Sequence, residues 1–549
     1  MSRILTFAFL IGVFSFAEAQ FVDPQNIVIR NLYIVTESPE VVPVSLLIRD
    51  NKLELVSKDE IPTPAGILAI DANGGFLIGE LELNAPPSFI ILSDDPRENF
   101  EVLLDTDSHA VFAIHQGQLR KNRLLYAADT LDEPEEEPKP QGWLAYTPPP
   151  MAIPTNYGDE SKWNQWKTEN TTGIFLAATV LDRQHWLSQN SDSEQQVGDL
   201  DSYDGGEIRG LRFGAVGTLN YFDKPWVYTV FAATNAFDKG FEDQQLDDIQ
   251  LDDIILFDYR LDMPFTGNVT LSVGKQKEPI SMERIMSMIN LPMQERTSVS
   301  DALMPSRNLG AVLSGTSLNE RMSWAGGIFN NFIDSDHSIG DTATQVVGRV
   351  TWLVFITEDE SNLVHLGFGA RLSNARQGVQ YLTEPEFNKS PDFVDTDFID
   401  ADNAQTYNFE ASWRRGPYWL AAEYVDANVD SPSSGNLSFS GYHITASWIL
   451  SGEMRSYYKK SGIFGPVPVA RSVYQNGWGA WEVAARWSSI DLTEPLVQGG
   501  EMDILSFGIN WWLSPTFQVN ANYRFITTDR DGLNGESSGL MTRVVLVLE

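Results

Sequence analysis

The sequence predicts an all-β protein: a transmembrane antiparallel β-barrel of about 16 strands, preceded by a small N-terminal β-sandwich domain. Three observations lead to this fold class. Segments of about ten residues with alternating apolar and polar side chains recur over the C-terminal two thirds of the chain. Aromatic residues, 11% of the chain with 15 Trp, repeatedly begin or end the apolar faces of these segments. Beyond the N-terminus, no stretch approaches the roughly 18 consecutive apolar residues of a transmembrane helix.

Residues 1–19 are predicted to be a signal peptide. Arg3 supplies a positive charge, residues 4–16 are apolar, and residues 17–19 (AEA) form a small-x-small cleavage site. An anchoring helix is the alternative, but the apolar stretch is short and a cleavage site follows it. We therefore expect an exported protein. With no Cys in the sequence, it has neither disulfides nor thiolate chemistry.

Residues 20–128 are predicted to form the small β-sandwich domain. Strand-sized apolar runs without helical periodicity alternate with turn signals, at 27–35, 42–49, 52–56, 66–70, 88–92 and 110–114. Residues 129–160 are predicted to be a linker. Its first part, Asp129 to Pro138, has six acidic residues and no basic one, and further prolines follow at 148–150. Proline fixes φ and removes a donor, so we expect an extended, solvated spacer.

Residues 161–549 are predicted to form the barrel. In residues 517–525 (FQVNANYRF), apolar side chains fall on one face of a strand and polar or charged ones on the other. Three further segments repeat this pattern, at 364–372, 407–414 and 442–450. A soluble sandwich is the alternative, but long acidic loops alternate with tight turns and the apolar faces end in aromatic residues, as in membrane barrels. About 385 residues, at about 24 for each strand and connection, give about 16 strands.

The charge of the chain restricts its partners. There are 38 Lys and Arg against 75 Asp and Glu, a net charge of −37. Nucleic acid is therefore not an expected partner, because phosphates require a cationic footprint. The sequence has only six His and contains no G-x-S-x-G elbow, Walker loop or H-E-x-x-H motif. We expect no enzymatic activity, no cofactor and no bound metal.

Several motifs in the predicted barrel resemble the phosphate-selective porin O/P family. They are residues 274–279 (GKQKEP), 294–296 (QER) with 307–310 (RNLG), 479–488 (GAWEVAARWS) and 507–513 (FGINWWL). The resemblance implies a porin in the outer membrane of a Gram-negative bacterium, with the N-terminal domain in the periplasm. It implies a homotrimer that contacts membrane lipid and lipopolysaccharide. Small hydrophilic solutes, with anions such as phosphate among them, would diffuse through it passively.

Eight basic residues are candidates to line the pore: Lys275, Lys277, Arg296, Arg307, Arg349, Arg371, Arg414 and Arg524. Alternation places the last four on inward faces. Arg296 and Arg307 fall in the irregular stretch after Lys277, where the resemblance implies a loop folded into the pore. In the alternative interpretation, the arginines pair with lumen carboxylates such as Glu410 and Glu423. Because charge at a constriction outweighs screened charge on loops, we expect weak anion selectivity without high phosphate affinity.

The N-terminal domain shows a second resemblance. Residues 31–35, 46–53, 70–79, 88–99 and 111–119 resemble the β-sandwich strands of an amidohydrolase. In that family the catalytic metal barrel begins with an H-x-H strand, and here residues 80–84 (ELELN) stand in its place. We therefore expect a catalytically inert remnant. The presence of this N-terminal domain also supports an alternative function, that of a barrel-anchored periplasmic binding or structural protein.

Overall fold

A computed structural model of the chain describes residues 26–35, 42–62, 67–97, 99, 101–104, 109–115, 118–122, 124, 145–149, 162–234, 254–265, 268–332 and 338–548. The predicted signal peptide and most of the predicted linker lie outside these described residues, so both stay predictions. The described chain separates into two compact units, an N-terminal sheet domain and a barrel.

The N-terminal strands pair in one seven-stranded sheet with the order β3-β2-β1-β4-β5-β6-β7. The strands are β1 (Ile27–Ile34), β2 (Val42–Arg49), β3 (Lys52–Ser57), β4 (Leu68–Glu80), β5 (Ser88–Leu92), β6 (Ala110–His115) and β7 (Gln118–Asn122), and a short helix α2 (Glu101–Leu104) precedes β6. Only β1 and β4 pair in parallel. Ile29, Leu46, Ile70 and Phe112 belong to its main core. The prediction of a small all-β domain is confirmed.

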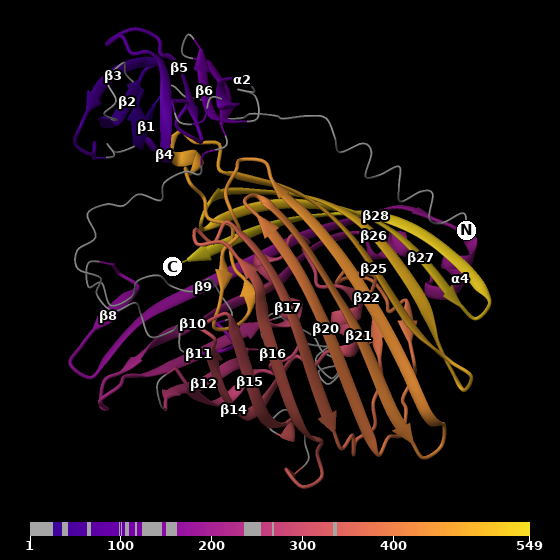
Figure 1. Cartoon of the computed structure of the whole chain (residues 1–549). Helices are drawn as coiled ribbons and strands as arrows, with labels where there is room; N and C mark the ends of the chain where they lie inside the picture. Colours follow the sequence, from indigo (N-terminus) through magenta and orange to yellow (C-terminus); the bar gives the residue numbers. More distant parts are fainter. Residues whose placement is uncertain are drawn as a thin grey trace. The chain divides into compact units, whose positions relative to one another are not determined.

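The second unit is a closed antiparallel barrel (Figure 1). Sixteen long strands form its wall within the described residues: β9 (Thr171–Gln189), β10 (Gly205–Leu219), β11 (Trp226–Thr234), β12 (Ile255–Pro264), β13 (Thr270–Lys277), β14 (Arg307–Ser317), β15 (Met322–Asn330), β16 (Thr344–Ile356), β17 (Asn362–Ser373), β20 (Asn403–Arg415), β21 (Tyr418–Ser431), β22 (Gly435–Ile449), β25 (Ala480–Glu494), β26 (Val497–Ser514), β27 (Phe517–Arg530) and β28 (Leu533–Leu548). A three-residue strand, β8 (Gln165–Lys167), also pairs with β9. Pairing of β28 with β9, from Ser537↔Gln189 to Leu548↔Ala177, closes the barrel. The predicted fold class is confirmed.

The strands of the barrel have one apolar outer face and one inner face with many polar groups. In β20, Phe409 and Trp413 are 53% and 38% exposed, whereas the intervening Asn408, Glu410 and Ser412 are buried. Because successive side chains of a strand point to opposite faces, this pattern directs the aromatic rings to lipid and the polar groups to the lumen. No helix among the described residues combines the length and apolar composition needed to cross a membrane.

The connections differ between the two ends of the barrel. At the end where the chain enters β9, most connections are short: 220–225, 265–269, 318–321, 357–361, 416–417 and 515–516. One long connection, 450–479, also belongs to this end. The first five connections at the other end are long: 190–204 with α4 (Ser191–Val197) and η2 (Leu200–Tyr203), 235–254, 278–306, 331–343 and 374–402. Long loops at one end and tight turns at the other are typical of outer-membrane barrels.

Candidate functional site: the barrel lumen

The connection between β13 and β14, residues 278–306, is folded into the barrel. It contains α5 (Met282–Ile285), η4 (Met288–Asn290) and α6 (Ser298–Leu303). The backbone N–H groups of Met282 and Glu283 donate to the Glu423 carboxylate on β21, at 3.2 and 2.6 Å. The N–H of Gln294 donates to Oδ1 of Asn522 on β27 at 2.8 Å. The segment thus contacts strands far from its own in the sheet, and we call it the inner loop.

Two basic side chains donate hydrogen bonds to backbone carbonyl oxygens of the inner loop. The Lys277 ammonium, at the end of β13, donates to the carbonyl oxygens of residues 284–286 at 2.7, 3.3 and 2.9 Å. Three carbonyls match the three N–H donors of an ammonium group. Arg296 donates to the carbonyl oxygens of Glu283 and Met286 at 3.4 and 2.8 Å. These two predicted pore residues therefore shape the loop that occupies the lumen.

Two further connections contribute to the lumen. They are residues 374–402, with β18 (Leu382–Thr383) and β19 (Val394–Asp395), and the part of connection 450–479 that holds β23 (Tyr457–Tyr458) and β24 (Ile463–Phe464). The short helix η6 (Val473–Gln475) of the same connection is exposed. In the first, Glu386 accepts hydrogen bonds from Arg486 and Ser488 on β25. In the second, Arg455 donates to Glu482 on β25 at 2.6 Å. Both segments are thus tied to the inner wall by charged groups.

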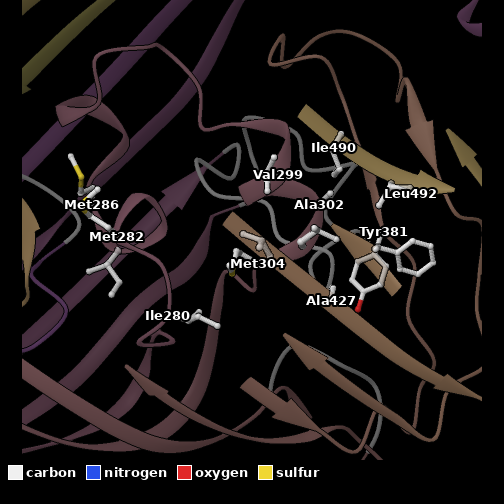
Figure 2. Packing of buried hydrophobic residues seen from close by; sticks show 14 of the residues in the cluster. Ile280, Met282, Met286, Val299, Ala302, Met304, Tyr381, Ala427, Ile490 and Leu492 are labelled. Atoms are coloured by element: carbon white, nitrogen blue, oxygen red, sulfur yellow. The ribbon is translucent and has the colours of Figure 1, made fainter. Parts of the chain in front are cut away.

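A hydrophobic core lies inside the barrel, where alternation alone predicts a polar, water-filled interior. It joins the inner loop, residues 374–402 and 450–479, and inward-facing apolar side chains of the strands. Figure 2 shows part of it: Ile280, Met282, Met286, Val299, Ala302 and Met304 from the inner loop, Tyr381 from residues 374–402, and Ala427, Ile490 and Leu492 from the strands. Burial of these groups stabilises the inward position of the connections.

Four of the predicted arginines form ion pairs inside the barrel, with the carboxylates of Glu410, Glu278, Glu386 and Asp258. Arg349 on β16 donates through Nε and Nη2 to both oxygens of Glu410, at 2.7 and 2.6 Å. Arg371 on β17 lies 3.0 Å from Glu278. Arg524 on β27 lies 3.5 Å from Glu386 of residues 374–402.

The inner wall also carries Arg414, Lys275 and Arg307. Arg414 on β20 donates to carbonyl oxygens of residues 455 and 360, the first at 2.6 Å. Lys275 is buried on β13. Arg307 was predicted in the irregular stretch, and this placement is wrong: Arg307 begins β14. Arg307 pairs with Lys277 in the β13–β14 ladder, so the chain is already extended as a strand at this residue. The Nε of Arg307 lies 2.9 Å from both oxygens of Asp258 on β12.

Ion pairing with lumen carboxylates, the alternative stated above, holds for Glu410. Glu423 instead accepts backbone N–H groups of the inner loop and the amide of Asn408, at 3.0 Å. Among the described residues, no three His, Asp or Glu side chains are grouped as metal ligands would be. That these basic residues act on solutes in the pore stays a prediction.

Sequence reasoning missed several inward basic residues: Arg209, Arg212, Arg260, Arg455, Arg486 and Arg543. The alternation of inward and outward residues could have identified Arg486 and Arg543, because each lies at an inward position of a long alternating strand. Arg209 and Arg212 are three residues apart, so simple alternation places them on opposite faces. A register shift between Ile208 and Gly210 in the pairing of β10 with β9 brings both inside.

Two guanidinium groups lie against one aromatic ring on the wall formed by β10, β12 and β14. The guanidinium carbons of Arg212 and Arg307 lie 4.2 and 4.0 Å from the ring centroid of Phe257. Guanidinium groups at this distance are attracted to an aromatic ring. The ring therefore holds two cations near each other, with Asp258 paired to Arg307.

A sequence model for the family described as "Phosphate-selective porin O and P" matches residues 183–545. The chain belongs to this family. The match covers most of the barrel and confirms the resemblance that the motifs indicated. Membership of this family places the chain in the outer membrane and points to a channel for passive diffusion.

Solved porin structures also resemble this chain. OmpT of Vibrio cholerae has 10% sequence identity and a TM-score of 0.42, covering 70% of this chain and 99% of OmpT. An anion-selective porin from Comamonas acidovorans has 10% identity and a TM-score of 0.41, covering 69% and 100%. An uncharacterized protein of Caulobacter vibrioides is 23% identical over 270 residues, which are 47% of this chain and 54% of the relative. The chain therefore spans about half the length of this curated relative.

Proposed function

We propose that small hydrophilic solutes diffuse passively through this porin, with a weak preference for anions. The supporting observation is the sign of the buried charge. From residue 162 onward, fifteen Arg and Lys but only eleven Asp and Glu are buried among the described residues, although the net charge of the whole chain is −37. The buried charge of the described barrel is thus net positive, opposite in sign to the charge of the whole chain. Buried charge acts on an ion in the lumen at close range, whereas exposed charge is screened.

The Arg307–Asp258 pair offers a test with its own matched control. Replacing one partner leaves the charge of the other uncompensated in the lumen. Reversal potentials would be measured on single channels in planar bilayers across a KCl gradient. We expect Arg307→Gln to shift the reversal potential toward cations and Asp258→Asn to shift it toward anions. Equal shifts in the same direction, or none, would show that this wall does not set selectivity. Absence of single-channel current would contradict the diffusion function itself.

We also propose a trimer in contact with lipid and lipopolysaccharide, with the N-terminal domain in the periplasm. The short turns support this orientation, because outer-membrane barrels place tight turns in the periplasm and long loops outside. The chain enters β9 at the end with the tight turns. The N-terminal domain, with its predicted remnant of an amidohydrolase sandwich, then belongs to the periplasmic side. In this proposal that domain is catalytically inert, as the missing H-x-H strand predicts.

A further inference from the structure

A short piece of the predicted linker lies inside the barrel. In residues 145–149 (AYTPP), Tyr146 and Thr147 are 1% and 3% exposed. Tyr146 belongs to the same hydrophobic cluster as the inner loop. A spacer that only connected two domains would be solvated, as the composition of residues 129–160 predicted. Residues 145–149 are therefore not a solvated spacer. We call them the luminal strap.

Tyr146 is held by a pore arginine. Arg349 Nη1 on β16 donates to the Tyr146 hydroxyl at 2.7 Å, and the guanidinium carbon lies 5.9 Å from the ring centroid. The same guanidinium donates to the carbonyl oxygens of Ser461 and Gly462, at 2.6 and 2.8 Å. Together with Glu410, these groups surround Arg349. The strap thus occupies a position on Arg349 that an oxyanion in the lumen would otherwise take.

Thr147 is held by a second arginine on another strand. Arg260 Nη1 on β12 donates to the Thr147 hydroxyl. In the barrel, β12 and β16 are separated by β13, β14 and β15. Two adjacent residues of the strap therefore join distant parts of the inner wall. Pro148 and Pro149, which end the strap, restrict φ, so the strap loses little conformational freedom when it is held there.

We propose that the luminal strap restricts passage through the pore and covers Arg349 and Arg260. Both hydroxyls are neutral acceptors on cations, so the strap stands where an anionic solute would bind. Removing its side chains widens the lumen and exposes the two arginines. This inference rests on the proposed diffusion function, because a restriction has a consequence only where solutes pass.

Thiol labelling tests the position of the strap independently of any current. The sequence has no Cys, so a single introduced Cys reports only its own surroundings. In the folded full-length protein, we expect a charged, water-soluble thiol reagent to modify Tyr146→Cys slowly. The control is Tyr221→Cys, on a turn where Tyr221 is 65% exposed, and it should react fast. Equal rates would overturn the proposal.

Single-channel conductance tests the restriction. We expect Tyr146→Ala combined with Thr147→Ala to raise conductance by about twofold, since current follows the open cross-section of the pore. Tyr146→Phe, which removes only the hydroxyl, should have a smaller effect and shift the reversal potential toward anions. Tyr221→Ala, the matched control, should change neither quantity. Unchanged conductance in the double variant beside a conducting wild type would overturn the strap alone. No current in either protein would contradict the diffusion function as well.

Discussion

Glu278 shows how a single carboxylate is held inside this barrel. It lies at the start of the inner loop and accepts hydrogen bonds from Arg371, Asn308 and Gln345, at 3.0, 2.8 and 2.9 Å. These donors come from β14, β16 and β17, so one side chain links the loop to three strands. A buried carboxylate with a cation and two amide donors is well satisfied, and it loses much when the cation is removed.

Replacing Arg371 by Met should therefore destabilise the barrel by about 3 kcal/mol, because the Glu278 carboxylate is then buried without its cation. The free energy of unfolding would be measured by urea titration in lipid vesicles. Combining Arg371→Met with Glu278→Met should restore most of the lost stability, because no uncompensated charge remains. A double variant as unstable as the single one would show that the ion pair is not the cause.

At the scale of the elements, alternation predicted the wall of the barrel well. Residues 407–414 and 517–525 lie in β20 and β27 with the predicted faces outward. Alternation failed where the strand is irregular, as at the bulge that brings Arg209 and Arg212 to one face. It also could not show the apolar patches of the inner wall, because inward Ile490 and Leu492 pack against connections distant in sequence. These contacts depend on tertiary structure, which a period of two does not encode.

The inner loop depends on one carboxylate of the wall for much of its attachment. Glu423→Ala removes the acceptors of the Met282 and Glu283 N–H groups. Each buried donor left without a partner costs about 1–3 kcal/mol, so the loop should move away from β21. We expect larger single-channel conductance and larger current noise. Glu423→Gln keeps one oxygen acceptor and should have an intermediate effect. Conductance traces identical to wild type would show that the loop is held by its apolar contacts alone.

At the scale of the whole molecule, two opposite charge distributions coexist. The chain carries a net charge of −37, yet basic residues outnumber acidic ones among the buried charged groups of the barrel. Exposed carboxylates and buried basic side chains both act electrostatically on a passing ion, but salt screens them to different extents. The Debye length falls from about 10 Å at 0.1 M salt to about 3 Å at 1 M, which weakens exposed charges far more than buried ones.

Raising the KCl concentration from about 0.1 M to about 1 M should therefore strengthen the anion preference. Screening removes the attraction of exposed carboxylates for cations and leaves the buried arginines in place. The permeability ratio would be obtained from reversal potentials at a constant concentration gradient across the bilayer. An anion preference that disappears at high salt would assign the deciding charges to the exposed surface.

The proposed orientation of the molecule in the outer membrane rests on the lengths of its connections. The chain enters β9 at the end with the tight turns, and the turn that contains Asp531 joins β27 to β28 at the opposite end. Leu83 in the N-terminal domain is 55% exposed and the Asp531 side chain 68% exposed, so both positions suit labelling. Because the chain has no Cys, each single Cys variant gives one signal.

With the N-terminal domain in the periplasm, a maleimide coupled to a polymer too large to diffuse through porins should label Asp531→Cys in intact cells and leave Leu83→Cys unmodified. Permeabilising the outer membrane should make Leu83→Cys reactive, which serves as the control for its accessibility. The expected difference arises because the outer membrane keeps so large a reagent out of the periplasm, whereas the opposite end of the barrel faces the medium. Labelling of Leu83→Cys in intact cells, with Asp531→Cys protected, would reverse the proposed orientation and place the N-terminal domain outside the cell.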